Sequence, residues 1–285
     1  MLKRILVALD RDLDTPVATR YAIKLAKTFN ASLTGLAVVD LSTIKTVVGG
    51  GGIGTIHYAQ QLRSKMADES REVAGKLLQN FKELVESSDI EHSKFMHEGV
   101  PHDRIIEDSK YHDMLVIGRE SHFIYNRPDA ETKTLANIVK RGAGPTLMVT
   151  DSYRPVNRVV VAHDGSRASS HVLQWFVQLE PFGKDIEIDI VYVCNTEKEE
   201  ATDKGKLLLH LANNYLKAHG YEKINELLLN GKGGSGKQIL NHVTDTNTDL
   251  VVMGAHSMTG IKKLTFGSVT RELVRKSPVP LFLSS

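Results

Sequence analysis

Two short segments in the second half of the chain carry residue types that bind anions. Gly254 ends an apolar run and opens the segment 254–257, and Gly267-Ser268 follows after nine further residues, directly before a helical pattern. A glycine at a strand end lets the backbone approach a ligand. A Gly-Ser pair at a helix start offers N–H groups, a hydroxyl and the positive end of the helix dipole. These residues predict an anion cradle. The simpler alternatives are that Gly254 relieves crowding and that Ser268 only caps the helix.

A second glycine-rich segment, 231–238, matches the spacing of a phosphate loop: glycine, four residues, then Gly-Lys. Gln238 stands where that motif needs Ser or Thr to reach Mg²⁺, and no apolar run of the second half ends in the usual acidic ligand. The residues therefore argue against a true phosphate loop. They favour a basic loop near the same ligand, in which Lys232 or Lys237 contacts a phosphate.

Residues for acid–base, nucleophilic or metal chemistry are present but are not grouped in sequence. The chain has no Gly-x-Ser-x-Gly nucleophile motif, and His97 and His102 lack the spacing of a zinc site. We interpret Ser166 as a helix cap and Asp164 as a partner for a ligand hydroxyl. Cys194 is interpreted as a small buried hydrophobic residue. No catalytic residue and no metal ligand is predicted.

Composition limits the class of protein. The chain has 285 residues, and 36 Lys and Arg residues nearly balance 34 Asp and Glu residues, for a net charge of +2. This balance gives no argument for nucleic acid or an anionic membrane as a partner. Cys194 is the single cysteine, no stretch is long and apolar enough to span a bilayer, and the opening apolar run stops at Asp10. We expect a cytoplasmic protein without nucleic-acid or membrane partners.

The sequence contains the same unit twice. Residues 4–10 recur as 158–164, and residues 113–118 recur as 249–254, in the same order within each half. A chain of about twice the usual domain length agrees with such a duplication. We therefore expect each half to contain the same elements in the same order.

Each unit alternates apolar runs of five or six residues with helical patterns, which predicts an α/β fold. We expect two tandem domains, 1–150 and 156–285, each with a doubly wound parallel sheet, joined by the short linker 151–156. The expected strands lie near 3–9, 33–39, 92–97, 114–118, 146–149, 158–163, 186–193, 222–229, 249–253 and 280–284. The expected helices lie near 15–29, 62–87, 101–110, 132–141, 167–179, 198–219, 236–246 and 268–276. A glycine-rich loop is expected at 47–54. Ligands of such sheets bind at the carboxyl ends of the strands.

The spacing of Gly254, Gly267 and Ser268 resembles the nucleotide-binding motif of the universal stress protein family, and the resemblance extends over nearly the whole chain in two copies. It implies a Rossmann-like fold of the adenine nucleotide alpha hydrolase type and binding of ATP, with or without Mg²⁺. It further implies that Asp164 contacts the adenosine, that the backbone of Val193 contacts the adenine, and that the phosphates lie against the two glycine segments. The implied nucleotide-binding residues are Ala162, Asp164, Val193, Met253, Gly254, Ser257, Gly267, Ser268 and Val269. His256 and Lys237 are candidate phosphate contacts.

Both halves depart from the family motif, to different degrees. In the second half, Ser257 replaces the second glycine, where its side chain either crowds the phosphates or donates a hydrogen bond. The first half keeps Asp10 and Gly118, but 131–132 or 132–133 replaces the Gly-Ser turn. In one of these registers a carboxylate would face the phosphates, which opposes binding. We interpret the first half as a structural copy.

The resemblance implies a stress-response or signalling module in which a bound nucleotide orders residues 254–270 and changes the surface offered to a protein partner. Two alternatives stay open: an interaction scaffold that binds no nucleotide, and a weak ATP hydrolase or phosphotransfer enzyme that uses Lys237 and His256. The family also implies that the sheets pair through 146–149 and 280–284 as an internal pseudo-dimer. Assembly of two chains into a homodimer is left open.

Overall fold

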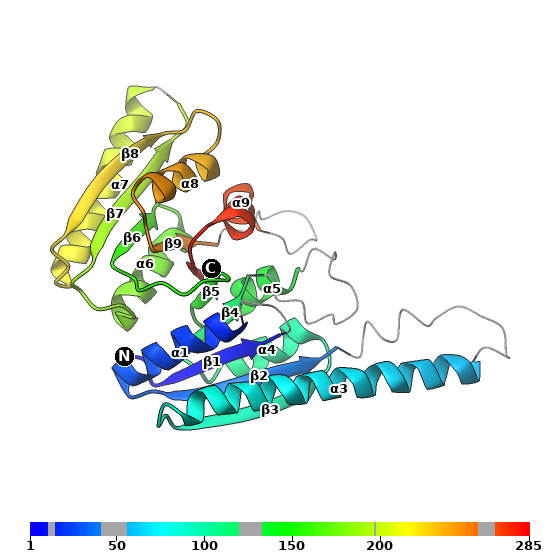
Figure 1. Cartoon of the computed structure of the whole chain (residues 1–285). Helices are drawn as coiled ribbons and strands as arrows, with labels where there is room; N and C mark the ends of the chain where they lie inside the picture. The colour runs from blue at the N-terminus through cyan, green and yellow to red at the C-terminus, as the bar shows by residue number, and fades with distance from the viewer. Residues whose placement is uncertain (11–14, 41–55, 120–132, 197, 256–265) are drawn as a thin grey trace.

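The computed structural model describes residues 1–10, 15–40, 56–119, 133–196, 198–255 and 266–285. Its strands form one ten-stranded sheet in the order β3-β2-β1-β4-β5-β10-β9-β6-β7-β8 (Figure 1). Neighbouring strands are parallel except for β5 and β10, which pair antiparallel. The two halves therefore share a single sheet, and each contributes five strands in the same order.

The elements follow the sequence prediction closely in both halves. The first half contains β1 (Arg4–Leu9), α1 (Thr15–Phe29), β2 (Ser32–Val39), α3 (Ile56–Glu86), β3 (His92–Glu98), α4 (Pro101–Ser109), β4 (Met114–Gly118), α5 (Lys133–Arg141) and β5 (Thr146–Val149). The second half contains β6 (Arg158–Ala162), α6 (Arg167–Leu179), β7 (Glu187–Cys194), α7 (Glu199–Ala218), β8 (Ile224–Asn230), α8 (Ser235–Asp245), β9 (Leu250–Gly254), α9 (Ser268–Lys276) and β10 (Leu281–Ser284). The α/β fold class is confirmed.

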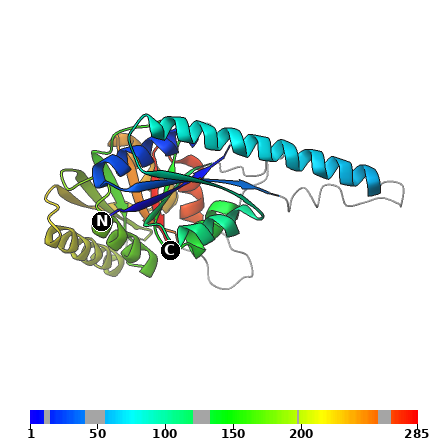
Figure 2. The same cartoon turned by 90° about the horizontal axis from the view of Figure 1, so that it is seen from below.

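One helix differs clearly from its prediction. Helix α3 begins at Ile56 rather than near residue 62 and is 31 residues long. Its first turns extend past the end of the sheet (Figure 2), so no sheet packing marks where the helix starts. The glycine-rich loop expected at 47–54 lies outside the described residues.

The core forms two apolar layers, one on each face of the sheet. Along β1, Ile5 and Val7 pack in the layer covered by α1, α3, α6 and α7, whereas Leu6 and Ala8 pack in the layer covered by α4, α5, α8 and α9. Side chains alternate between the faces of a strand, so a strand covered by helices on both faces must be apolar at consecutive positions. This is why the central strands appear in the sequence as unbroken runs of Val, Ile and Leu.

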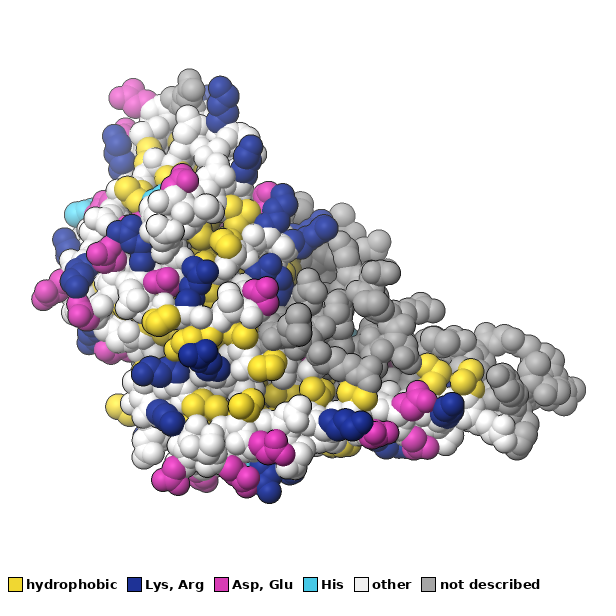
Figure 3. All heavy atoms as spheres, viewed as in Figure 1, with side chains coloured by type: hydrophobic (Ala, Val, Ile, Leu, Met, Phe, Trp, Pro, Cys, Tyr) yellow, Lys and Arg dark blue, Asp and Glu magenta, His cyan; other side chains and the backbone are white. Residues whose placement is uncertain are grey.

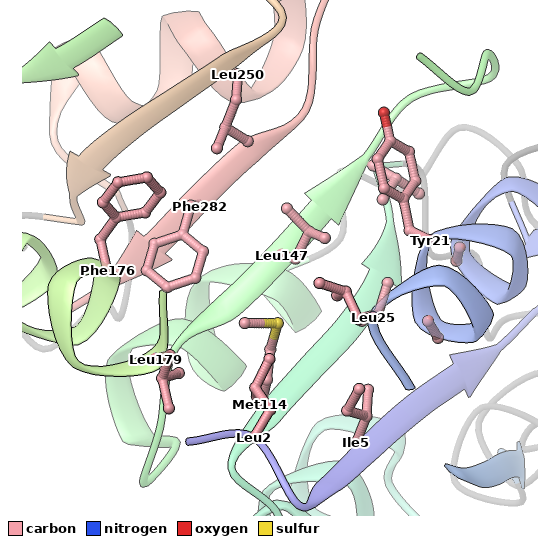
Figure 4. Packing of buried hydrophobic residues seen from close by; sticks show 14 of the residues in the cluster. Leu2, Ile5, Tyr21, Leu25, Met114, Leu147, Phe176, Leu179, Leu250 and Phe282 are labelled. Carbon is pink, nitrogen blue, oxygen red and sulfur yellow. The ribbon is translucent and has the colours of Figure 1, made fainter. Parts of the chain in front are cut away.

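The halves join through their last strands. Leu147 of β5 lies opposite Phe282 of β10, and Leu281 lies opposite Met148. Phe282 meets the ring of Phe176 from α6 edge-on, at 5.7 Å between centroids (Figure 4). The predicted pairing through 146–149 and 280–284 is confirmed, and it places an otherwise exposed apolar strand edge in the middle of the sheet.

The linker is held against the first half by Tyr21 of α1. The Tyr21 hydroxyl donates to the carbonyl oxygen of Arg154 at 2.9 Å and accepts from the Arg154 N–H at 3.2 Å. The rings of Tyr21 and Tyr153 are 4.7 Å apart, and the Arg20 guanidinium lies 4.1 Å from the centre of the Tyr153 ring. These contacts fix the linker, in agreement with the prediction of a short connection.

The duplication is also visible in hydrogen bonds. Asp113 accepts from the backbone N–H groups of Lys3 and Arg4, at 2.6 and 2.9 Å. Asp249 accepts in the same way from the residues that open β6, Asn157 and Arg158, at 2.9 and 3.0 Å. The carboxylates that begin the repeated segments 113–118 and 249–254 thus fix the start of the first strand in each half.

The described surface carries charges of both signs. On the face in Figure 3, Lys and Arg side chains are interspersed with Asp and Glu side chains. Among the helices that the structure describes, none has the length and apolar content needed to cross a membrane.

Candidate functional site

A cavity of about 390 Å³ lies at the carboxyl ends of the strands in the second half. Its volume falls within the roughly 300–1,000 Å³ of small-molecule sites. Strands β6, β7 and β9 and the amino-terminal ends of α6, α8 and α9 supply its walls. The lining residues are Ala162, His163, Asp164, Ser169, Val191, Tyr192, Val193, Asn195, Ser235, Ile239, Met253, Gly254, Gly267, Ser268, Val269 and Thr270.

The structure brings most of the sequence-predicted site residues together around this cavity. Those that line it are Ala162, Asp164, Val193, Met253, Gly254, Gly267, Ser268 and Val269. His256 and Ser257 lie outside the described residues. Lys237 is exposed on α8 and is not among the lining residues. Its contact with a phosphate therefore stays a prediction.

One part of the cavity wall is apolar. Val191 and Val193 of β7, Ala162 of β6, Met253 of β9 and Ile239 of α8 form it. All five belong to, or pack against, the core layer between the sheet and helices α4, α5, α8 and α9. A wall of this kind suits a flat, weakly polar group such as a heterocyclic ring.

The other part of the wall is made by helix starts. Gly267 is the N-cap of α9 and Ser268 its first residue, and no side chain of the described residues makes a capping hydrogen bond to this helix. Ser268 is therefore not the cap that the simpler alternative supposed. Helices α8 and α9 lie side by side beside β9 (Figure 1), and Ser235 opens α8 at the same cavity. Backbone N–H groups at such helix starts favour an anionic group.

Gly254 is required by packing. A side chain there would place its Cβ 2.5 Å from the carbonyl carbon of Ala168 and from the nitrogen of Ser169, at the start of α6. The crowding explanation for Gly254 is therefore confirmed. Because α6 fits tightly against the end of β9, its first turn becomes part of the cavity wall through Ser169.

Asp164 lies exposed at the cavity, two residues after β6. Its Oδ1 accepts from the backbone N–H of Ser166, and the Ser166 hydroxyl accepts from the N–H of Ser169, which caps α6 as predicted. Partial desolvation raises the pKa of Asp164, but the hydrogen bonds from Ser166 and Ser169 outweigh it and hold the pKa below its usual range. The carboxylate is therefore ionised at pH 7.

His163 also lines the cavity and is only 7% exposed. Burial lowers its pKa, and the neighbouring Asp164 and a backbone contact with Ser169 only partly offset this effect. Its Nδ1 has no hydrogen-bond partner within the described residues. The imidazole is therefore neutral at pH 7.

Sequence reasoning missed several lining residues, above all Asn195 and Ser235. Their signals in the sequence were slight: a polar residue two positions after Val193, and a serine inside a glycine-rich segment. Cys194, by contrast, is buried as expected, and its thiol donates to the carbonyl oxygen of Thr196 at 2.9 Å. Among the described residues, no group of three His, Cys, Asp or Glu side chains is arranged to hold a metal ion.

Comparison with known proteins agrees with the duplicated α/β unit. The model of the universal stress protein family matches residues 1–127 and 155–284. The chain belongs to the universal stress protein family. It is a tandem member, because the family match occurs once in each half.

Several relatives of this universal stress protein align with it over nearly the whole length of both chains. A universal stress protein of Synechocystis sp. is 24% identical over 290 residues, covering 98% of this chain and 99% of that protein. The crystal structure of a universal stress protein from Archaeoglobus fulgidus has a TM-score of 0.67 at 18% identity and covers 99% of this chain and 96% of that one. A structure of a putative universal stress protein from Pseudomonas aeruginosa has a TM-score of 0.62 at 11% identity, with coverage of 99% and 93%. These structures share the fold.

Proposed function

We propose that the second half of this tandem universal stress protein binds an adenine nucleotide, ATP in the first place. The observation that carries the proposal is the cavity itself, where an apolar wall meets the start of α9 across one continuous space. An adenine nucleotide has the same division into a flat heterocycle and an anionic chain. The family resemblance in the spacing of Gly254, Gly267 and Ser268 supports the same ligand.

Each part of the cavity has a role in this proposal. The apolar wall around Val193 and Met253 holds the base, and the ionised Asp164 accepts a hydrogen bond from a ribose hydroxyl. The N–H groups at Ser268 and Val269, which no side chain of the described residues caps, face the phosphates, where the helix dipole favours negative charge. His256, Ser257 and Lys237 are proposed as further phosphate contacts. Asp164 is the one carboxylate among the described lining residues, so a Mg²⁺ ion would depend chiefly on the phosphates for its ligands.

The proposal is a binding function and not an enzymatic one. The described lining offers no acid–base pair: His163 is buried and neutral, and Asp164 is held ionised by hydrogen bonds. Occupancy of the cavity is proposed to change the surface that the chain presents to a protein partner, as in a signalling module. We further propose that the two domains span residues 1–150 and 156–285 and that the protein is located in the cytoplasm.

Gly267→Asp tests the proposal, with Gly267→Asn as the matched control. The backbone at Gly267 has a φ of −62° and a ψ of 167°, which both residues adopt readily, and both are good N-caps. Both variants should fold, but only aspartate places a negative charge against the phosphates. We expect isothermal titration calorimetry to show a loss of ATP affinity of at least about tenfold for Gly267→Asp relative to Gly267→Asn. Absence of ATP binding by the unmodified protein at high micromolar ATP would instead favour the interaction scaffold.

A further inference from the structure

A side-chain hydrogen bond joins two loops at the cavity. Asn195 follows β7 directly, and Ser235 is the first residue of α8. The Ser235 hydroxyl donates to Oδ1 of Asn195 at 3.1 Å, across 40 positions of sequence. Both residues line the cavity on the side of β7, next to Val193. We call this pair the Asn195–Ser235 bridge.

The glycine-rich segment before α8 makes the bridge sterically feasible. The N–H of Gly231 donates to the carbonyl oxygen of Cys194 at 2.7 Å, and a Cβ at Gly231 would collide with Oδ1 of Asn195. Gly233 and Gly234 have φ values of +91° and +105°, a region that other residues rarely adopt. The segment 231–234 therefore allows the chain to turn sharply after β8, and this turn brings Ser235 against Asn195. This explains its glycines without a true phosphate loop.

The equivalent place in the first half is built differently. Val39 and Cys194 are the last residues of their strands to pair with the neighbouring edge strand, so Asp40 and Asn195 occupy the same register position. In the first half, only Val100 separates Gly99 from the start of α4. In the second half, three residues separate Gly231 from the start of α8. At this register position the first half thus has neither the amide nor the longer turn.

The bridge presents a defined pair of groups to a ligand. Because Oδ1 of Asn195 accepts from Ser235, its Nδ2 remains as a donor, and it makes no hydrogen bond within the described part of the chain. The Ser235 oxygen, whose hydrogen is used in the bridge, remains as an acceptor. A donor beside an acceptor matches the edge of adenine, where a ring nitrogen lies beside an amino group. Guanine has a carbonyl oxygen in place of that amino group, so Ser235 would have to break the bridge to donate to it.

We propose that the Asn195–Ser235 bridge contacts the edge of the bound base and makes the site prefer adenine to guanine nucleotides. This rests on the proposed nucleotide-binding function and adds a side-chain contact to the backbone contact that the family resemblance assigns to Val193. The pair is exposed in the structure, and a bound base would cover it. Once covered, its polar groups cost binding free energy if the base leaves them unpaired, as guanine would.

The test is calorimetric titration of the full chain with ATP and with GTP, for the unmodified protein, Ser235→Ala, and Ser170→Ala as a matched control. Ser170 lies on α6 outside the set of cavity-lining residues. We expect Ser235→Ala to lower the preference for ATP over GTP by about tenfold, mainly through weaker ATP binding, and Ser170→Ala to leave it unchanged within twofold.

Asn195→Asp is the second variant. It introduces the residue type that the first half has at this register position, and its carboxylate still accepts from Ser235 while the Nδ2 donor is lost. We expect the same loss of preference. If the unmodified protein binds ATP but both variants keep its preference, the role of the bridge is overturned and the proposed nucleotide binding stands. If the unmodified protein binds neither nucleotide, the proposed function itself fails, and the bridge proposal with it.

Discussion

Each half has an aspartate directly after or close to the end of its first strand, and the two carboxylates have different surroundings. Asp10 is fully buried and accepts a hydrogen bond from the Thr15 hydroxyl at 2.6 Å, and that hydroxyl accepts from the N–H of Asp10 at 3.1 Å. Asp164, its counterpart after β6, is exposed at the cavity and accepts from a backbone N–H. The sheet places both side chains at equivalent strand ends. Both carboxylates accept a hydrogen bond from a nearby residue of their own half, but only that of Asp164 is exposed at the cavity.

The residues after the fourth strands differ in a related way. Arg119, after β4, donates to the carbonyl oxygens of Arg275 and Ser277 at the carboxyl end of α9. Ala255, after β9, is buried, and its N–H donates to Ser284 of β10. The first half thus contacts one end of the helix whose other end lines the cavity. We therefore propose a division of labour, in which the second copy holds the ligand site and the first supports the helix that lines it.

The largest expected effects come from removing the two carboxylates separately. Asp10→Ala leaves the buried Thr15 hydroxyl without its acceptor and should lower the free energy of unfolding by about 1–3 kcal/mol, with ATP affinity unchanged within twofold. Asp164→Ala should weaken ATP binding by about tenfold, with a change in the free energy of unfolding below about 1 kcal/mol. Urea denaturation and calorimetry measure the two quantities. Equal losses of ATP affinity in both variants would contradict the division of labour.

An intermediate effect is expected at the contact between the halves. Arg119→Ala removes a cation from the carboxyl end of α9 and leaves two carbonyl groups with fewer donors, which should lower the free energy of unfolding by about 1 kcal/mol. Arg119→Lys keeps the charge and should lose less. ATP affinity should stay within twofold, because the contact lies at the end of α9 away from the cavity. A clear loss of affinity would mean that the first half contributes to binding directly.

The smallest effect is a pH dependence that both halves share. Burial is the main cause that lowers the pKa of His163 at the cavity and of His112 in the first half. Each histidine is therefore protonated more readily in the unfolded chain, whose reference pKa is about 6.5. The free energy of unfolding should fall as the pH is lowered through that value towards the lower pKa of the folded state. Denaturation at pH 7.5 and 5.5 should show a smaller fall for His163→Gln and for His112→Gln. An unchanged fall in both variants would show that neither histidine carries the effect.

Most of the fold could be predicted from the sequence because its signals are local and occur twice. Consecutive apolar residues such as those of β1 and β6 indicate strands covered on both faces, and the repeated order of elements indicates the duplication. The start of α3 was missed because the first turns of the helix extend past the sheet, so their sequence does not need an apolar face for sheet packing. The pairing of β5 with β10 came from family resemblance, since no local pattern specifies which strand edges meet.

The site could be predicted only in part. Gly254, Gly267 and Ser268 are recognisable because glycine at a strand end and Gly-Ser at a helix start have a local meaning. Asn195 and Ser235 were missed because their contact depends on the order of strands and on positive φ values before α8. Such contacts between distant positions become visible only in three dimensions.

The number of ATP molecules bound per chain tests the central claim most directly. Calorimetric titration of the unmodified chain should give one site per chain, and Gly267→Asp should weaken binding at that site by at least about tenfold relative to Gly267→Asn. Two sites per chain would show that the first half also binds the nucleotide. A single site with equal affinity in Gly267→Asp and Gly267→Asn would show that the phosphates do not lie against the start of α9, and either result would contradict the central claim.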